Sequence, residues 1–189
     1  MNKPLVFEKL QFEFGPSWHA VCWDKDKAYT DGIQRLSHEG LGGTKGVDCL
    51  AVHSRFGVCF LEVTDGRGDA QFARTIDSKR VFAEVGFKVR DTLAGLVSTL
   101  SNEGSNGDKW EPFRQPLRDG RFSVVLWIEH DAPARAQEAE HSFYTDTLRR
   151  YVGWLTRRRL LVTNLRLGGN DLLPDLTVTN LEGAGQHSG

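Results

Sequence analysis

The chain has 189 residues, of which 39% are hydrophobic and 26% are charged. This length and composition are typical of an ordinary soluble protein with one domain that is long enough to bury a full core. The 24 basic and 25 acidic residues nearly cancel, to a net charge of -1, so the molecule as a whole is not strongly attracted to nucleic acid, although a local basic patch is compatible with this balance.

The N-terminal residues have neither the apolar segment nor the small-residue cleavage site of a secretory signal, and no segment has the length of a membrane-spanning helix. The three cysteines, Cys22, Cys49 and Cys59, lie in apolar segments, and their odd number argues against a disulfide framework. We therefore expect reduced thiols in a cytoplasmic protein. The six histidines have no metal-ligand spacing, which argues against a zinc site.

The first half of the chain predicts strands, one polar helix and a hairpin. Strands are expected at residues 5–14 and 18–23, and a polar helix at 24–36. The apolar runs 47–52 and 58–63 flank the turn sequence HSRFG, which predicts an antiparallel hairpin. The Gly- and Asp-rich stretch 66–78 predicts an exposed loop.

The second half predicts two long helices and three strands. Residues 79–100 have helical apolar spacing with Asp77 or Ser78 as N-cap, and a second amphipathic helix is expected at about 134–158. Strands are expected at 121–131, 160–167 and 176–181. The polar runs 101–109 and 182–189 predict a loop and a disordered tail. Four tryptophans are expected in the core: Trp18, Trp23, Trp127 and Trp154. The fifth, Trp110, is expected at the surface.

Continuously apolar strands indicate a sheet that is covered on both faces. Together with the helices they predict a single α/β domain over residues 1–181, with a central mixed β-sheet flanked by helices on both faces. Glu129 and Asp131 end one of these strands, and we expect both acids to lie in solvent.

Two acids are expected to lie level with each other in the hairpin, because Asp48 and Glu62 are equally far from its turn. Neighbouring carboxylates repel each other unless a proton or a cation lies between them. A divalent cation such as Mg²⁺ would satisfy both acids and keep waters that a substrate phosphate can displace. By spacing alone, surface salt bridges from Lys45, Arg55 or Arg67 explain the two acids more simply.

The sequence around this hairpin resembles the PD-(D/E)XK superfamily of restriction-endonuclease-like nucleases. The resemblance lies in "KGVDCLAV…CFLEVTDGRG" followed by "EVGFKVRDTLAGL", and with VVLWIE and WLTRRRLLVTNL it extends over most of residues 5–181. It implies a restriction-endonuclease-like fold. It also implies that Asp48, Glu62 and the backbone carbonyl of Val63 bind Mg²⁺ or Mn²⁺.

The lysine of the superfamily motif is expected at position 64, where this chain has Thr64. A hydroxyl supplies no positive charge and is too weakly acidic to act as a base at neutral pH. Glu84, Lys88 and Asp91 share one stripe of the following helix. Resemblance to members with a relocated lysine implies a catalytic Lys88, with Glu84 as an extra ligand or an orienting acid. An ion pair between Glu84 and Lys88 on a solvated helix face is an equal alternative.

The resemblance implies metal-dependent hydrolysis of phosphodiester bonds in nucleic acid, with DNA favoured, in bacterial restriction or anti-phage defence. The alternative is a catalytically inactive module of the same fold that binds nucleic acid or scaffolds a partner protein. Either function would use a protein partner or a homodimer, because the chain has no separate recognition domain. Arginines near the end of the second helix would contact phosphates or, more simply, complement the helix dipole: Arg149, Arg150, Arg157, Arg158 and Arg159.

Overall fold

The computed structural model describes most of the chain. The described residues are 3–32, 34, 43–77, 79–101, 109–131, 134–156 and 158–181. Several sequence predictions fall outside them: the N-cap at Ser78, most of the loop at 101–109, part of the helix at 24–36, the arginine at 157 and the tail at 182–189.

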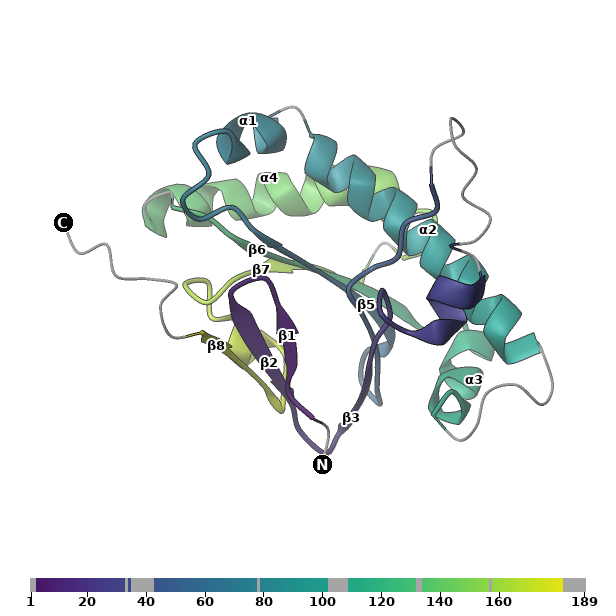
Figure 1. The fold of residues 1–189 in the computed structure, drawn as a ribbon. Coiled ribbons are helices and arrows are strands. Elements are labelled where there is room, and N and C mark those ends of the chain that lie inside the picture. Colours follow the sequence, from purple (N-terminus) through teal and green to yellow (C-terminus); the bar gives the residue numbers. More distant parts are fainter. Residues whose placement is uncertain are drawn as a thin grey trace.

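A mixed five-stranded sheet lies at the centre of the fold (Figure 1). Its strands, in spatial order, are β3 (Trp18–Cys22), β4 (Cys49–His53), β5 (Gly57–Asp65), β6 (Phe122–Glu129) and β7 (Leu160–Thr163). The pairs β3–β4 and β4–β5 are antiparallel, and β5–β6 and β6–β7 are parallel. The predicted α/β class, the mixed sheet and the hairpin are confirmed. The single domain is also confirmed, because all the described elements pack on this one sheet.

Helices cover one face of the central sheet. The long helices α2 (Arg80–Ser101) and α4 (Ala134–Val152) lie side by side across it, and the short α1 (Phe72–Asp77) lies beside them (Figure 1). Phe60 of β5 and Leu126 of β6 point into this helical core, where they join Val85 and Val89 of α2. The apolar spacing that predicted the helix at 79–100 therefore marks its buried face.

A second sheet covers the other face together with the short helix α5 (Gly169–Leu172), which packs on Trp127 of β6, so the helices predicted on this face are reduced to one short helix. β1 (Leu5–Phe7), β2 (Leu10–Phe14) and β8 (Leu176–Asn180) form three antiparallel strands, packed on Leu61 and Val63 of β5. The alternating β2 side chains give this small sheet one apolar side, which suffices to cover the central sheet. The chain reverses at Glu8, which has a φ of 52°, and the predicted strand 5–14 is thereby split into a hairpin.

Some segments that are polar in composition are ordered and packed. The predicted loop at 66–78 contains α1, whose Phe72 and Ile76 are buried. A π-helical turn, Ala28–Gly32, lies within the predicted helix 24–36. The structure adds two short helices, α3 (Glu111–Arg118) and α5 (Gly169–Leu172). Local burial outweighed composition in the first case, because two well-spaced apolar residues are enough to dock a short helix.

The predictions that Trp110 lies at the surface and Trp154 in the core were both wrong. Trp110 is 1% exposed and packs edge-on against Trp23, whereas Trp154 is 57% exposed beyond the end of α4. Glu129 is also buried, because its Oε1 accepts hydrogen bonds from Trp127 Nε1 and from the Leu165 backbone N–H. The prediction that Glu129 lies in solvent was therefore wrong.

The three cysteines are free thiols, as expected. Among the described residues, no helix combines the length and the apolar character needed to cross a membrane.

Candidate active site

The β4–β5 hairpin places Asp48 and Glu62 opposite each other. Asp48 directly precedes β4, and the pairing of Cys49 with Leu61 puts Glu62 at its level on β5. Oδ2 of Asp48 accepts the backbone N–H of Val63 at 2.7 Å, which holds the carboxylate against β5. The two acids are therefore neighbours, as their spacing predicts.

Helix α2 brings Lys88 to the same place. Its Nζ donates a hydrogen bond to Oε1 of Glu62 within an ion pair. The side chains of Glu62 and Lys88 are 7% and 23% exposed, so this contact is largely shielded from water. Alternation along β5 explains the meeting, because Phe60, Glu62 and Thr64 point to the face that α2 covers.

Glu84 does not form the alternative ion pair with Lys88. Its Oε1 instead lies 3.1 Å from Nε of Arg80 and 3.7 Å from Nζ of Lys45. The Glu84 side chain is 38% exposed, so this acid lies at the rim of the site. The structure thus brings Lys88 to the acid pair and leaves Glu84 outside it.

The salt bridges that spacing alone favoured for Asp48 and Glu62 are also not formed in the described part of the chain. Lys45 pairs with Glu84, as above, and Arg67 pairs with Asp65 at 2.6 Å. The guanidinium of Arg55 lies over the ring of Phe56, 5.5 Å from its centroid. The simpler explanation of the two acids was therefore wrong.

The backbone carbonyl of Val63 is directed toward Asp48. The N–H groups of Val58 and Gly66 donate to carbonyls of the β6 segment, whereas the Val63 N–H donates to Asp48 on the β4 side. Even-numbered β5 residues therefore direct their backbone groups to β6, and odd-numbered ones to β4. Because N–H and C=O of one strand residue point to the same neighbour, the Val63 carbonyl faces the same side as the Asp48 carboxylate.

Burial and crowding of charge shift the pKa values of all three groups. Burial, followed by the nearby Asp48 carboxylate, raises the pKa of Glu62 to about 8, against a lowering by Lys88. Burial also raises the pKa of Asp48, while the Val63 N–H and Lys88 lower it. Although burial opposes protonation of Lys88, Glu62 and Asp48 raise its pKa. Near neutral pH the site therefore has a charged lysine and an acid that readily holds a proton.

Two hydrogen bonds to α2 fix the segment that leads into Asp48. The backbone N–H of Lys45 donates to Oδ2 of Asp91 at 3.1 Å, and that of Val47 donates to Oγ1 of Thr92 at 2.9 Å. Both acceptors are buried. From the sequence, Asp91 could be placed on the Lys88 stripe but without a role, and the contact of Thr92 was not predicted. The available signal was that Asp91 and Thr92, whose side chains often accept hydrogen bonds from backbone N–H groups, follow Lys88 by one turn on the same helix.

The residues of this site fit a divalent cation such as Mg²⁺. Oε2 of Glu62 is buried and has no hydrogen-bond partner, which is costly for a carboxylate oxygen unless a proton or a cation occupies it. Mg²⁺ is commonly held by one or two carboxylates and retains several waters. Asp48, Glu62 and the Val63 carbonyl supply ligands of this kind. In the described residues, no three His, Cys, Asp or Glu side chains gather as a denser metal site.

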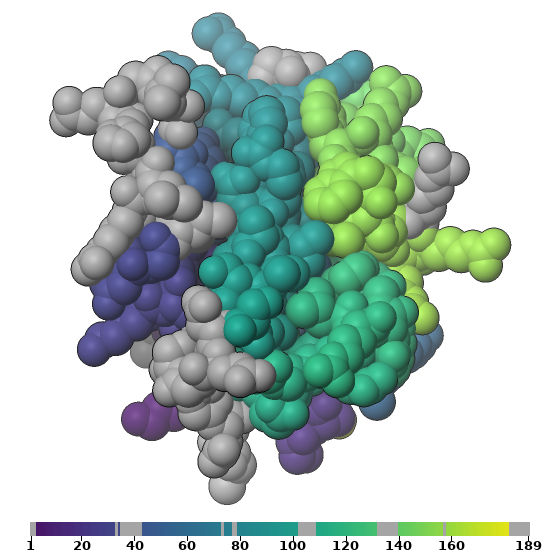
Figure 2. All heavy atoms as spheres, turned by 90° about the vertical axis from the view of Figure 1, so that its right-hand side faces the viewer, coloured from purple at the N-terminus to yellow at the C-terminus, as the bar shows by residue number. Residues whose placement is uncertain are grey.

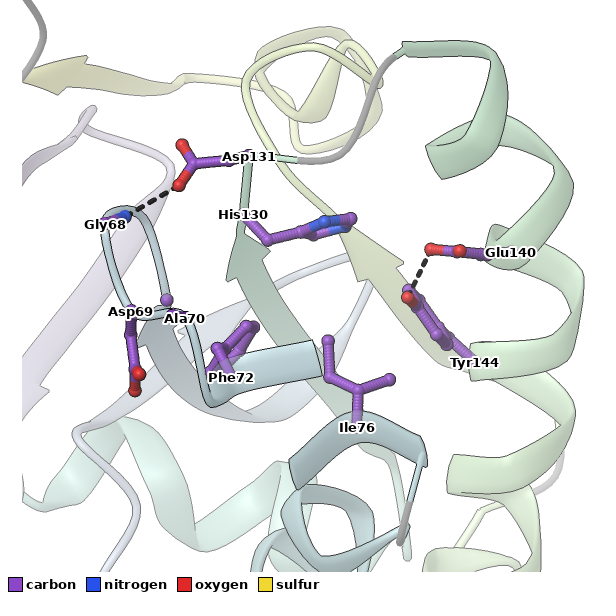
Figure 3. A pocket seen from close by; sticks show the side chains of 10 residues that line it. Gly68, Asp69, Ala70, Phe72, Ile76, His130, Asp131, Glu140 and Tyr144 are labelled. Atoms are coloured by element: carbon purple, nitrogen blue, oxygen red, sulfur yellow. Dashed lines mark hydrogen bonds between the residues drawn. The ribbon is translucent and has the colours of Figure 1, made fainter. Parts of the chain in front are cut away.

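A separate pocket of about 500 Å³ lies at the carboxyl ends of β5 and β6 (Figure 3). His130, which follows β6, and Glu140 of α4 both point into it, above Phe72 and Ile76 of α1. The Tyr144 hydroxyl donates to Glu140, and burial lowers the pKa of His130. This pocket shares no lining residue with the acid pair, so it does not form part of the candidate active site.

Comparisons of this chain with protein-family models, with curated proteins and with solved structures found no match.

Proposed function

We propose that this protein hydrolyses phosphodiester bonds of nucleic acid with the help of Mg²⁺ or Mn²⁺, with DNA favoured over RNA. The observation that carries the proposal is the contact of Lys88 with Glu62 beside Asp48. Two acids and one ammonium group thus meet on the face of β5 to which Thr64 also points. This is the set of groups in the PD-(D/E)XK motif that the hairpin sequence resembles, with the lysine supplied from α2.

Each residue has a chemical task in this proposal. Asp48, Glu62 and the Val63 carbonyl would hold the cation, and the Val63 N–H fixes the orientation of Asp48. When bound, a divalent cation lowers the pKa of water and stabilises the charge that develops on the phosphodiester. Lys88 stays protonated because Glu62 and Asp48 raise its pKa, and it therefore offers positive charge to phosphate oxygens. Glu84 acts from the rim by holding Lys45 and Arg80.

The biological setting is also a proposal. The chain resembles bacterial nuclease-fold proteins, which supports a role in restriction or anti-phage defence in the cytoplasm. Recognition of a particular target by a protein partner or by a second copy of the chain is part of the same proposal.

Cleavage assays with Mg²⁺, with Mn²⁺ and with a chelator test the activity. Asp48→Asn and Glu62→Gln are expected to abolish metal-dependent cleavage, and Lys88→Ala to slow it roughly a hundredfold. Glu13→Gln, an exposed acid on β2, is the matched control and should retain full activity. Undiminished cleavage by both acid variants, with folding verified by circular dichroism, would contradict the proposal.

A catalytically inactive module that binds nucleic acid or scaffolds a partner is the second candidate. Thr64 favours it, because the motif position itself carries no charge. Calorimetric titration with Mg²⁺ separates the two candidates. A nuclease should bind Mg²⁺ and should lose this binding in Asp48→Asn. An inactive module should cleave no nucleic acid, and its binding of nucleic acid should be the same with and without the substitution.

A further inference from the structure

Exposed aromatic rings and arginines gather where α2 meets the end of α4. We name this set, Phe87, Arg90, Arg150, Tyr151 and Trp154, the aromatic–arginine surface. The side chains of Phe87 and Trp154 are 53% and 57% exposed, which is unusual for rings of this size. In Figure 2, α2 (teal) runs down the middle of this face, and the residues around the end of α4 (yellow-green) lie directly beside it.

Contacts make the set continuous across the two helices. A Cβ atom added at Gly86 of α2 would lie 3.0 Å from Cβ of Tyr151, so the two helices touch there. Arg90 lies one turn after Gly86, and its guanidinium is 5.2 Å from the centroid of the Phe87 ring. Trp154 Nε1 donates to the Tyr151 carbonyl at 2.9 Å, which holds the indole in place. The Trp154 indole and the Phe87 ring thus each have a defined contact before any ligand arrives.

The surface continues around α2 toward the candidate active site. Phe87 and Asp91 are neighbours one turn apart on α2, and Asp91 shares its stripe with Lys88. Crossing the outer face of one helix spans about 10 Å, which is close to three stacked nucleotides at about 3.4 Å each. A ligand that begins on Trp154 and Tyr151 can thus reach Lys88 by way of Arg90 and Phe87.

The positive charge of the two arginines favours an anionic ligand. Arg150 is exposed, and in the described part of the chain it has no carboxylate within ion-pair distance, so its charge is open to solvent. Arg90 pairs with Asp91 but is 61% exposed and can contact a second anion. Cations beside aromatic faces favour a polyanion whose bases can stack, because every base presents a π-face.

We propose that the aromatic–arginine surface binds a single strand of nucleic acid and leads it to Lys88 and the acid pair. The inference rests on the proposed nuclease function and adds to it a preference for unpaired substrate. A duplex keeps its base faces stacked inside, so it cannot use the exposed rings, whereas a single strand can lay its bases on Phe87 and Trp154.

Fluorescence polarisation with a labelled thymidine oligonucleotide of roughly twelve nucleotides tests the proposal. The full chain is titrated in chelator, so that binding is measured without cleavage, against the strand alone and against its duplex. The single strand is expected to bind at least tenfold more tightly. Trp154→Ala and Phe87→Ala should each weaken its binding by at least fivefold, whereas Leu172→Ala, which removes an exposed apolar side chain from α5, should not change it.

A charge reversal gives a second test that does not disturb packing. Arg150→Glu should weaken binding and reduce the slope of log K against log salt by about one, whereas Lys3→Glu, the same charge change before β1, should do neither. Equal binding of strand and duplex, or unchanged binding by the three surface variants, would overturn the inference. Absence of binding would overturn it too. None of these results depends on cleavage, so they stand apart from the outcome of the Asp48→Asn and Glu62→Gln assays.

Discussion

Replacing Glu62 by glutamine removes a buried charge from the candidate active site, and the metal-free protein is expected to respond by becoming more stable. Burial and the Asp48 carboxylate raise the pKa of Glu62 from 4.5 to about 8. Because this pKa is higher in the folded than in the unfolded state, ionisation of Glu62 favours unfolding. The penalty is absent below the unfolded pKa, grows as the pH rises, and is complete above the folded pKa.

The size of the effect follows from the shift in pKa. Each unit of difference corresponds to about 1.4 kcal/mol, so the cost of ionising Glu62 grows by about 3 kcal/mol between about pH 5 and about pH 8. Glutamine keeps the size of the side chain and can accept the Lys88 hydrogen bond, but it does not ionise. The stability of Glu62→Gln relative to the natural chain should therefore increase by about 3 kcal/mol over this range of pH.

Urea denaturation followed by tryptophan fluorescence, in chelator and at several pH values, measures this difference. Glu111→Gln, an exposed acid at the start of α3, serves as the control and should shift little with pH. A constant difference between Glu62→Gln and the natural chain would refute the reasoning. Loss of stability in Glu62→Gln at alkaline pH would do the same, because it would mean that Glu62 is ionised and gains more from Lys88 than it loses by burial.

Three further predictions concern other parts of the chain. Thr64→Lys, introduced into the Lys88→Ala variant, should raise its cleavage rate at least tenfold, because both positions serve the same face of β5. An unchanged rate in a nuclease assay would argue against a shared role. Glu129→Ala should cost about 2–4 kcal/mol in urea denaturation, since it leaves the buried Trp127 Nε1 and the partly buried Leu165 N–H without their acceptor, and a loss below about 1 kcal/mol would contradict this. Gly57→Ala should cost at least about 2 kcal/mol more than Gly120→Ala. Both glycines have positive φ, but only at Gly57 would the added Cβ lie 2.1 Å from a carbonyl oxygen; equal thermal unfolding temperatures would refute this.

The centre of the fold could be predicted because each element carries its own periodic signal. The hairpin is two apolar runs around a polar turn, and α2 repeats its apolar residues at helical spacing. Register then follows from the turn, so the meeting of Asp48 and Glu62 could be predicted as well. Lys88 could be placed on a stripe of the helix, but its contact with Glu62 depends on how α2 lies across the sheet, which no local pattern specifies.

The parts that could not be predicted depend on contacts between distant segments. The small sheet joins residues near both ends of the chain, and the turn at Glu8 lacks the glycine or asparagine that usually marks a two-residue hairpin turn. Trp110 stands between Lys109 and Glu111, whereas Trp154 stands between Gly153 and Leu155, so the neighbouring residue types favour the opposite of the observed burial. Only the packing of Trp110 against Trp23, and the end of α4 before Trp154, separate a buried ring from an exposed one.

A lysine on α2 has a consequence that a lysine at position 64 would not have. A residue on β5 would keep its place beside Glu62 as long as the sheet was intact, whereas Lys88 keeps its place only while α2 is docked. The same helix anchors the segment before Asp48 through Asp91 and Thr92. A shift of α2 would therefore move the ammonium group and one carboxylate together, and would disturb both sides of the proposed cation site. The outer face of α2 carries Phe87, so a strand bound to the aromatic–arginine surface would press on the element that holds the site together. If the two proposals hold, binding of a strand and the geometry of the acid pair would be coupled through this one helix.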